Sequence, residues 1–349
     1  MYYDSEALLE DEGVDANGGR LNCFFNAEDF RAILKGVKEN DPETMQLYAS
    51  GNNESVAQTI LRFMTEEEWE EVGRDISNNM HLMYVKFNDN AFNDRGMSAL
   101  FRGLIKSNSI RHMQIYYNDV AGLGGIQSML PFLQNAKKLV KLDISMVNEM
   151  RSEGFNMMFR ALQGSPIKEL KCWYCGIESI EIDIEHAPKH LENLYLGKNE
   201  IKAGGCRELA KLLQGDDTTL KILDLSENKI DDEGVAILVD VLQDNTLLTT
   251  LNLTDNIGDD DDEVPWSDVM TNQGKLLLLK LVNDISSTKA ILRSNHTLQH
   301  ICLGSNMRDP VTRDLLDIDQ RGKEINKHLK MATMINSMAK TRLQLEVQR

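Results

Sequence analysis

The chain has 349 residues, of which 42% are hydrophobic and 27% are charged, and its formal net charge is −17. This acidic balance argues against nucleic acid as the main partner, because no dense Lys/Arg tract is present to neutralise phosphates. The five cysteines are irregularly spaced, which favours free thiols and a reducing compartment, so we expect the protein in the cytosol or the nucleus.

The N-terminal 81 residues divide into two segments before any repeat begins. Residues 1–20 are acidic and rich in Gly and Asn, which predicts a disordered leader with no export signal. Residues 21–81 show helical periodicity in three runs, within 26–37, 56–63 and 65–76. In the third run Thr65 and Glu68 have capping-box spacing. We therefore expect a helical N-terminal cap over residues 21–81.

A short phrase returns nine times between Leu82 and Asn306: apolar, two free positions, apolar, one free position, apolar, then a small polar residue. The copies begin at Leu82, Ile110, Leu139, Ile167, Leu191, Leu220, Leu248, Leu276 and Leu298, with steps of 28, 29, 28, 24, 29, 28, 28 and 22 residues. Self-similarity at a nearly fixed period predicts a solenoid.

Each unit contains a strand pattern followed by a helix pattern. Leu223 and Leu225 alternate as in a strand with one buried face, and Gly234, Leu238 and Leu242 then recur every four residues, as on one face of a helix. Stacked strand–helix units give a right-handed solenoid with a parallel sheet backed by helices. Strands are predicted near 84–87, 112–115, 141–144, 169–172, 193–196, 222–225, 250–253, 278–281 and 300–303.

The period of 28–29 residues with a full helix in each unit resembles the ribonuclease-inhibitor subfamily of leucine-rich repeats, over residues 82–308. The resemblance implies an α/β horseshoe-shaped solenoid of about nine repeats, with strands on the concave wall, helices on the convex wall, and ligands held by the concave face or the loop rim. After Leu298 the pattern stops, and residues 309–349 predict a helical C-terminal cap.

Two units depart from this frame. The unit at Ile167 has Cys175 where other units have Asn, and its Pro188 would interrupt a helix. In the unit at Leu248, the segment 258–266 with the acidic run Asp259–Asp262 replaces the helix start. A row of carboxylates predicts a solvated loop, with a docking loop for a basic partner as the alternative.

No sequence motif for catalysis or for a cofactor is present, so we expect a non-enzyme. Cys172 and Cys175 form one CxxC, yet both fall on core positions of the repeat, which favours packing over redox or metal chemistry. The pairs His186 and His190, and His296 and His300, are spaced for one helical face, but neither pair has the flanking residues of a metal site.

The predicted site is the concave wall, because strand residues between core positions face outward. Exposed Tyr and Trp dominate protein interfaces, and aromatic and basic residues gather in the N-terminal repeats. The predicted partner-binding residues are Tyr84, Lys86, His112, Tyr116, Lys141, Lys171, Trp173 and Tyr195. We expect a monomeric scaffold that binds a protein partner, with a basic partner surface as one option, and that binds no nucleic acid or membrane.

Two further expectations concern a rival function and a structural role. Ran GTPase-activating proteins share this repeat type, which makes regulation of a small GTPase the alternative function. Those relatives carry an acidic tail after the repeats, whereas the acidic run here is internal.

The asparagines that end the repeat phrase are expected to satisfy turn backbone groups inside the protein. They are Asn90, Asn118, Asn199, Asn228 and Asn256.

Overall fold

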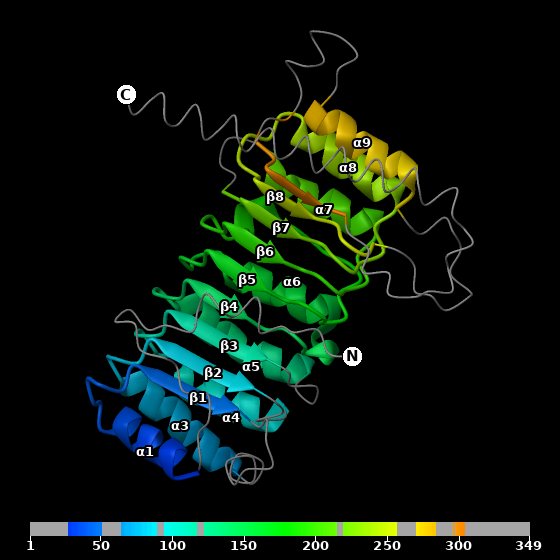
Figure 1. Ribbon diagram of the computed structural model, residues 1–349. Helices are drawn as coiled ribbons and strands as arrows, with labels where there is room; N and C mark the ends of the chain where they lie inside the picture. The colour runs from blue at the N-terminus through cyan, green and yellow to red at the C-terminus, as the bar shows by residue number, and fades with distance from the viewer. Residues whose placement is uncertain are drawn as a thin grey trace, which may run out of the picture.

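The computed structural model describes residues 27–50, 64–88, 94–116, 122–214, 219–256, 270–283, 295 and 297–303. In this part of the chain, nine strands form one parallel sheet in the order β1 to β9, so that each strand neighbours the next in sequence. Figure 1 shows the strands stacked as a ladder with the helices along one side of it. The predicted α/β solenoid is confirmed.

The strands and helices alternate along the described chain. The strands are β1 Gln46–Ser50, β2 Tyr84–Asn88, β3 His112–Tyr116, β4 Lys141–Asp143, β5 Glu169–Lys171, β6 Asn193–Tyr195, β7 Ile222–Asp224, β8 Thr250–Asn252 and β9 His300–Cys302. The helices are α1 Ala27–Lys38, α3 Glu66–Asn78, α4 Asp94–Leu104, α5 Leu123–Asn135, α6 Arg151–Ala161, α7 Ala203–Leu213, α8 Asp232–Leu242 and α9 Asn272–Asn283, with 3-10 turns η2 Asn148–Met150 and η3 Ile184–His186.

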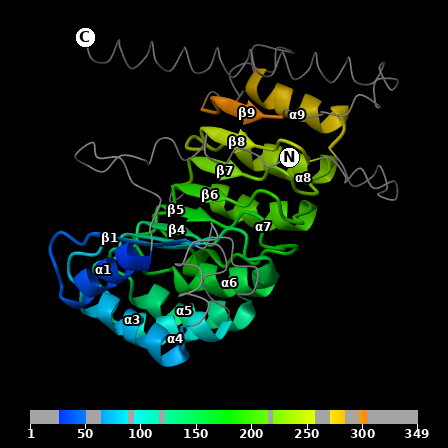
Figure 2. The ribbon, with the colours of Figure 1, turned by 60° about the horizontal axis from the view of Figure 1, so that its bottom comes forward.

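The solenoid bends with its sheet on the inner side. Parallel strands lie about 4.8 Å apart, whereas a helix with its side chains is about 10 Å wide, so the helical layer must be longer than the sheet. Figure 2 shows the two layers, with the helices more widely spaced than the strands that they cover. The open face of the sheet is therefore the concave wall.

One predicted strand is wrong. The residues at 278–281 lie in the middle of α9, Asn272–Asn283. Leu278, Leu281 and Val282 are buried there, while Leu276 is 43% exposed, a helical rather than an alternating pattern. The leucine run of this segment satisfies the repeat phrase by chance, and β9 follows β8 directly in the sheet. The copy at Leu276 is thus not a repeat of its own.

The N-terminal segment 21–81, for which a purely helical cap is predicted, contains a strand. Strand β1, Gln46–Ser50, pairs in parallel with β2, and α3 follows it, so this segment supplies one more strand to the solenoid. Helices α1 and α3 are present, and α3 has the predicted capping box between Thr65 and Glu68. Several predicted features lie outside the described residues. They are the helix at 56–63, Asn90, Asn118, the acidic run Asp259–Asp262, His296, and the segments 1–20 and 309–349.

The core lies between the sheet and the helices. In each strand from β4 to β8 the central residue is buried and its two neighbours are half-exposed, and in β3 the buried residues Met113 and Ile115 alternate with half-exposed ones. The largest fully buried side chains, Phe87, Phe101, Phe132, Phe155 and Phe159, gather in the N-terminal half. Burial of this apolar surface stabilises the fold by about 25 cal/mol per Å².

Buried asparagines close the turn at the carboxyl end of three strands. The Asn228 side chain accepts a hydrogen bond from Ile201 N at 3.0 Å and donates to the carbonyls of Leu196 and Ser226. Asn199 and Asn256 make the same kind of bonds across adjacent repeats. The predicted structural role is confirmed for these three residues, because their amides satisfy backbone groups that water cannot reach.

A second set of buried asparagines, which sequence reasoning missed, lies at the opposite end of the strands. Asn79, Asn245 and Asn295 each precede the first leucine of a repeat by three residues. Each donates to a carbonyl of the preceding unit and accepts from the two backbone N–H groups that lead into its own strand. The sheet is thus fixed by side-chain amides at both ends.

Helix-start residues join neighbouring repeats on the helical layer. The Asp94 carboxylate accepts hydrogen bonds from Gly122 N and Gly125 N, at the start of α5. Asp232 does the same for Thr271 N and Gly274 N, at the start of α9. A carboxylate at a helix N-terminus satisfies unpaired N–H groups and opposes the positive end of the helix dipole.

Replacing Asn228 by Ala is expected to lower the free energy of unfolding by about 1–3 kcal/mol, because the buried Ile201 N–H loses its partner and the carbonyls of Leu196 and Ser226 each lose one hydrogen bond. Chemical denaturation monitored by circular dichroism measures this change. Asn148, which is exposed, provides the control, since Asn148→Ala should leave the midpoint nearly unchanged. Equal midpoints for the Asn228 variant and the wild type would contradict the assigned role.

Candidate functional site

The eight predicted site residues all belong to the concave wall, on or directly after β2 to β6. Strand register aligns Tyr84, His112 and Lys141 in one column, and places Lys86, Lys171 and Tyr195 in the next. The eight side chains are half-buried: Tyr84, Lys86, His112, Tyr116, Lys141, Lys171, Trp173 and Tyr195. A half-buried side chain on a paired strand is held in place and still presents one surface to a ligand.

The N-terminal end of this wall is aromatic. The rings of Tyr84 and His112, on paired strands, lie 4.6 Å apart between centroids at 87°. This edge-to-face geometry is favourable for aromatic pairs and fixes both rings. Tyr116 lies at the end of β3 on the same face. Together these side chains form a preordered aromatic surface over β2 and β3.

The centre of the wall is an ion-pair network, so it is less basic than the sequence suggested. Glu169 lies between two predicted site lysines, with its carboxylate 3.7 Å from Lys141 Nζ and 3.2 Å from Lys171 Nζ. Asn193 donates a further hydrogen bond to the same carboxylate. The Glu169 charge offsets one of the two lysine charges, so these three side chains together keep one net positive charge.

Asp143 adds a second carboxylate to this network. It accepts hydrogen bonds from Gln114 Nε2 at 2.9 Å and from Ser145 N at 3.0 Å. Burial raises the pKa of Asp143 above its usual value, against the opposing effects of Ser145 and Lys171. For Lys171, burial alone would lower the pKa, but the charges of Glu169 and Asp143 raise it above the usual value. Lys171 is therefore a cation at neutral pH.

Aromatic and cationic side chains alternate toward the carboxyl ends of β5 and β6. Lys171 Nζ lies 5.2 Å from the centroid of the Tyr195 ring. Lys198 Nζ lies 5.0 Å from the Trp173 ring and 4.8 Å from the Tyr174 ring. These distances are typical of cation–π contacts. Tyr174 and Lys198 were not among the predicted residues, and they extend the site from the concave wall to its rim.

A left-handed backbone conformation places Tyr174 and Lys198 at this rim. The residue directly before the turn asparagine position has positive φ in five consecutive repeats: Met146, Tyr174, Lys198, Glu227 and Asp255, with φ from 50° to 57°. Non-glycine residues adopt this region rarely and at a cost. The sequence signal that could have found them is their constant offset, one position before Asn199 and its equivalents.

Gly197 allows the Trp173 ring to pack closely against the backbone of the next repeat. A Cβ atom at position 197 would approach Trp173 Cδ1 to 2.7 Å and Ser226 Oγ to 2.8 Å. Both distances are shorter than carbon and oxygen atoms tolerate. The absence of a side chain at Gly197 therefore sets the position of the Trp173 ring over β6.

The substitution Gly197→Ala is expected to turn the Trp173 ring away from the wall and to break its contact with Lys198. Tryptophan emission should shift to longer wavelength, since the ring becomes more hydrated. Gly204 gives a matched control, because a Cβ there would meet nothing within 4 Å. If Gly197→Ala and Gly204→Ala give the same spectrum, the packing of Trp173 on Gly197 is not what positions the ring.

The CxxC cysteines lie under the wall rather than on it. Cys172 and Cys175 are both free and fully buried, and the Cys175 thiol donates to the Ile144 carbonyl at 3.0 Å. Burial raises the pKa of Cys175 to about 12 and raises that of Cys172 well above its usual value. A protonated, enclosed thiol is a poor nucleophile, which agrees with the packing role predicted for the pair.

Alkylation of the native protein at neutral pH is expected to label Cys302, which is exposed, and to spare Cys172, Cys175 and Cys206, which are buried. Unfolding in denaturant should make all four equally reactive. Mass spectrometry of the digested protein reads each site separately. Rapid native labelling of Cys172 or Cys175, or a bond between them under mild oxidation, would contradict the packing role.

The pair His186 and His190, between β5 and β6, is not arranged as a metal site. His186 Nδ1 lies 2.6 Å from the Asp183 carboxylate, and His190 is exposed. Within the residues that the structure describes, no group of three or more His, Cys, Asp or Glu side chains could hold a metal ion. In the same residues, no helix has the length and apolar composition needed to cross a membrane.

Comparison with known proteins agrees with the geometry of the sheet. A family model described as leucine-rich repeat matches residues 78–101 and 216–238, which contain β2 and most of α4, and β7 and the start of α8. The chain therefore contains leucine-rich repeats, and its fold is a leucine-rich-repeat solenoid. Its strands recur with the repeat phrase, and its turn asparagines bond between neighbouring units.

The chain is also similar to a solved structure, that of human 5T4 (Wnt-activated inhibitory factor 1, Trophoblast glycoprotein). Sequence identity is 17%, the TM-score is 0.38, and the match covers 56% of this chain and 72% of that chain. No match was found among curated proteins.

Proposed function

We propose that this protein is a non-enzymatic scaffold that binds a protein partner through the concave wall, from Tyr84 on β2 to Tyr195 on β6. Leucine-rich-repeat domains are generally protein-interaction modules. The observation that carries the proposal is the row of half-buried aromatic side chains on one face of a hydrogen-bonded sheet. Large rings that are already fixed lose little entropy on binding, and such residues supply most of the energy of interfaces.

The ion-pair network at the centre gives the site its selectivity. Glu169 holds Lys141 and Lys171 in defined positions, so a partner meets a fixed pattern of one negative and two positive groups. A ligand that does not offer the complementary pattern leaves charges desolvated without partners, which costs several kcal/mol. We infer that the partner surface carries both acidic and basic groups flanked by apolar area.

The proposal also covers the oligomeric state, the location and the excluded ligands of the protein. We propose that the protein acts as a monomer in the cytosol or nucleus, that it is not an enzyme, and that its main ligand is neither nucleic acid nor membrane. A basic partner surface is favoured by the net charge of −17, which attracts positive surfaces at long range. Regulation of a small GTPase, the alternative from the resemblance, gains no specific support from the described residues.

Binding is tested by quantitative capture of partners with the intact chain and with two concave-wall variants, Tyr195→Ala and Trp173→Ala. Each variant should weaken partner binding by at least about 1–2 kcal/mol, as expected when an interface anchor is truncated. Ile184, which is 42% exposed on η3 between β5 and β6, provides the control. The variant Ile184→Ala should capture the same partners as the wild type.

Deletion of Asp259–Asp262 distinguishes partner binding by the concave wall from partner binding by the acidic segment. The proposal expects this deletion to preserve capture of the main partner. Capture that is lost on deletion and retained by both aromatic variants would assign the interface to the acidic segment instead. Thermal unfolding of every variant shows whether a loss of binding reflects a loss of fold.

A further inference from the structure

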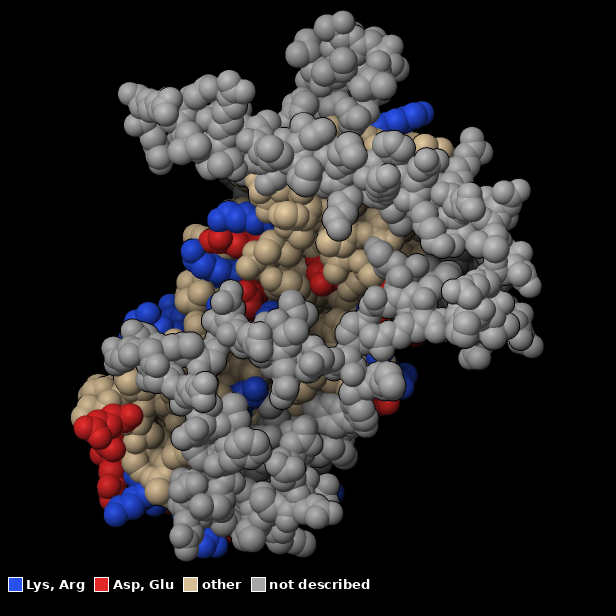
Figure 3. Space-filling model, in the orientation of Figure 1, with Lys and Arg blue, Asp and Glu red and all other residues tan. Residues whose placement is uncertain are grey.

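The loops that lead into β3 to β7 form a basic rim on this acidic protein. In these loops, all of the described Lys and Arg side chains are exposed: Lys106, Arg111, Lys137, Lys138, Lys168, Lys189 and Lys221. Glu192 is the one acidic residue that the structure describes in the same loops; Asp216 and Asp217, before β7, lie outside the described residues. Figure 3 shows Lys and Arg gathered along one edge of the molecule, at the left of the view, with acidic groups between them.

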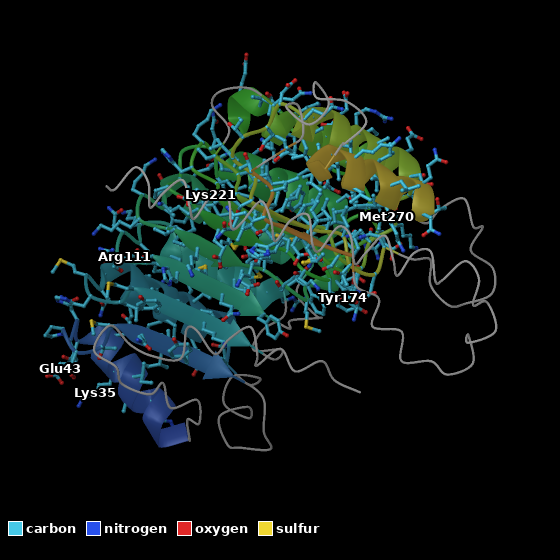
Figure 4. The ribbon with its side chains drawn as sticks, turned by 45° about the horizontal axis from the view of Figure 1, so that its top comes forward. Lys35, Glu43, Arg111, Tyr174, Lys221 and Met270 are labelled. Atoms are coloured by element: carbon cyan, nitrogen blue, oxygen red, sulfur yellow. The ribbon has the colours of Figure 1, made fainter. Side chains whose placement is uncertain are left out.

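Backbone hydrogen bonds place some residues of this rim side by side in one row along the sheet edge. Each residue that precedes a strand bonds to its equivalent in the previous repeat, in the order Arg111, Val140, Lys168, Glu192 and Lys221, with N···O distances of 2.7–2.8 Å. Because adjacent strands are about 4.8 Å apart, Arg111, Lys168 and Lys221 follow one another at about 10 Å. Figure 4 places Arg111 and Lys221 on the edge of the sheet opposite to Tyr174.

Within this row, the protein itself shows how two cations hold a carboxylate. The Glu192 carboxylate lies between its neighbours, with Oε1 at 2.8 Å from Lys168 Nζ and Oε2 at 2.6 Å from Lys221 Nζ. These contacts lower the pKa of Glu192, with the larger effect from Lys168. The carboxylate is thus charged and held from both sides.

The neighbouring pair of cations has the same spacing, and no carboxylate from the described residues is placed between them. Between Arg111 and Lys168, the position equivalent to Glu192 is Val140, whose side chain is apolar. Lys137 and Lys138, in the loop just before Val140, add two exposed charges beside this position. The rim is therefore positively charged around Val140. A carboxylate from another molecule could bind there between Arg111 and Lys168, as the Glu192 carboxylate binds between Lys168 and Lys221.

We propose that this rim binds an extended acidic segment of a protein partner, with one of its carboxylates between Arg111 and Lys168, above Val140. A short segment fits better than a long polyanion, because the net charge of −17 repels nucleic acid while a few local ion pairs can still form. The rim lies beside the concave wall and uses different residues, so this proposal does not depend on the binding role of Trp173 or Tyr195.

The test uses a fluorescent Gly/Ser peptide that carries Glu at alternate positions, and a second peptide with Gln in place of each Glu. Anisotropy at low ionic strength should show binding of the Glu peptide only, and added salt should weaken it. The variant Val140→Glu supplies the missing carboxylate from within the chain. It is expected to reduce the affinity for the Glu peptide by about tenfold.

Two matched variants separate charge from shape. Val140→Gln has nearly the same size as Val140→Glu without its charge, and should bind the Glu peptide like the wild type. Leu276, which is 43% exposed on α9 near the C-terminal end of the described solenoid, is remote from this rim, so Leu276→Glu adds the same charge and should change the affinity little. The converse variant Glu192→Gln releases Lys168 and Lys221 and should increase the affinity. Tyr195→Ala should bind the peptide normally, whatever its effect on the concave partner.

Three results would overturn the proposal. The first is equal affinity of the Glu and Gln peptides, and the second is equal binding by Val140→Glu and Val140→Gln. The third is tighter binding of a single-stranded oligonucleotide or an anionic vesicle than of the Glu peptide, with loss in Val140→Glu, which would make the rim a general polyanion surface. If Val140→Glu does not fold by circular dichroism, the double variant Arg111→Gln/Lys168→Gln takes its place, with the same expected loss.

Discussion

The parallel hydrogen-bond register of the sheet is the constraint on which the rest of this structure depends. Because each strand pairs with the next in sequence, equivalent residues of successive repeats lie side by side at about 4.8 Å. Alternation then sends one set of side chains into the core and the other to the concave wall. A shift of one residue in any strand would exchange the two sets, so the aromatic wall, the Glu169 network and the basic rim exist only in this register.

Buried side-chain amides hold this register at both ends of the strands. Asn228 and Asn256 close the turns after the strands, and Asn79, Asn245 and Asn295 fix the entries. Each amide pairs with backbone groups of two neighbouring units, so that one repeat cannot slide past the next without leaving polar groups unpaired. Where Cys175 stands at the turn position, its thiol and the Asn199 amide make these bonds instead.

The strand register places residues of different charge on different surfaces of the protein, although they alternate along the sequence. The protein as a whole carries a net charge of −17, yet at Glu169 the concave wall pairs one carboxylate with two lysines, and the strand-entry rim is locally basic. The carboxyl-end rim differs again, since Lys198 stacks on Trp173 and Tyr174 while Glu227 and Asp255 follow in the next repeats. Two edges and one wall of different chemistry allow one rigid solenoid to contact a partner at more than one place.

The sequence by itself determined the repeat, the α/β class and the identity of the outward positions, because periodic apolar residues report directly which face is buried. It could not distinguish the leucine run of α9 from a strand, since Leu276, Leu279 and Leu281 satisfy the same short phrase; only packing on α8 and the pairing of β9 with β8 decided between them. Strand β1 was missed because its unit lacks the full phrase. The pairing of Lys141 and Lys171 with Glu169, and of Lys168 and Lys221 with Glu192, joins residues from different repeats. Such contacts depend on side-chain directions across neighbouring strands, which only the tertiary structure fixes.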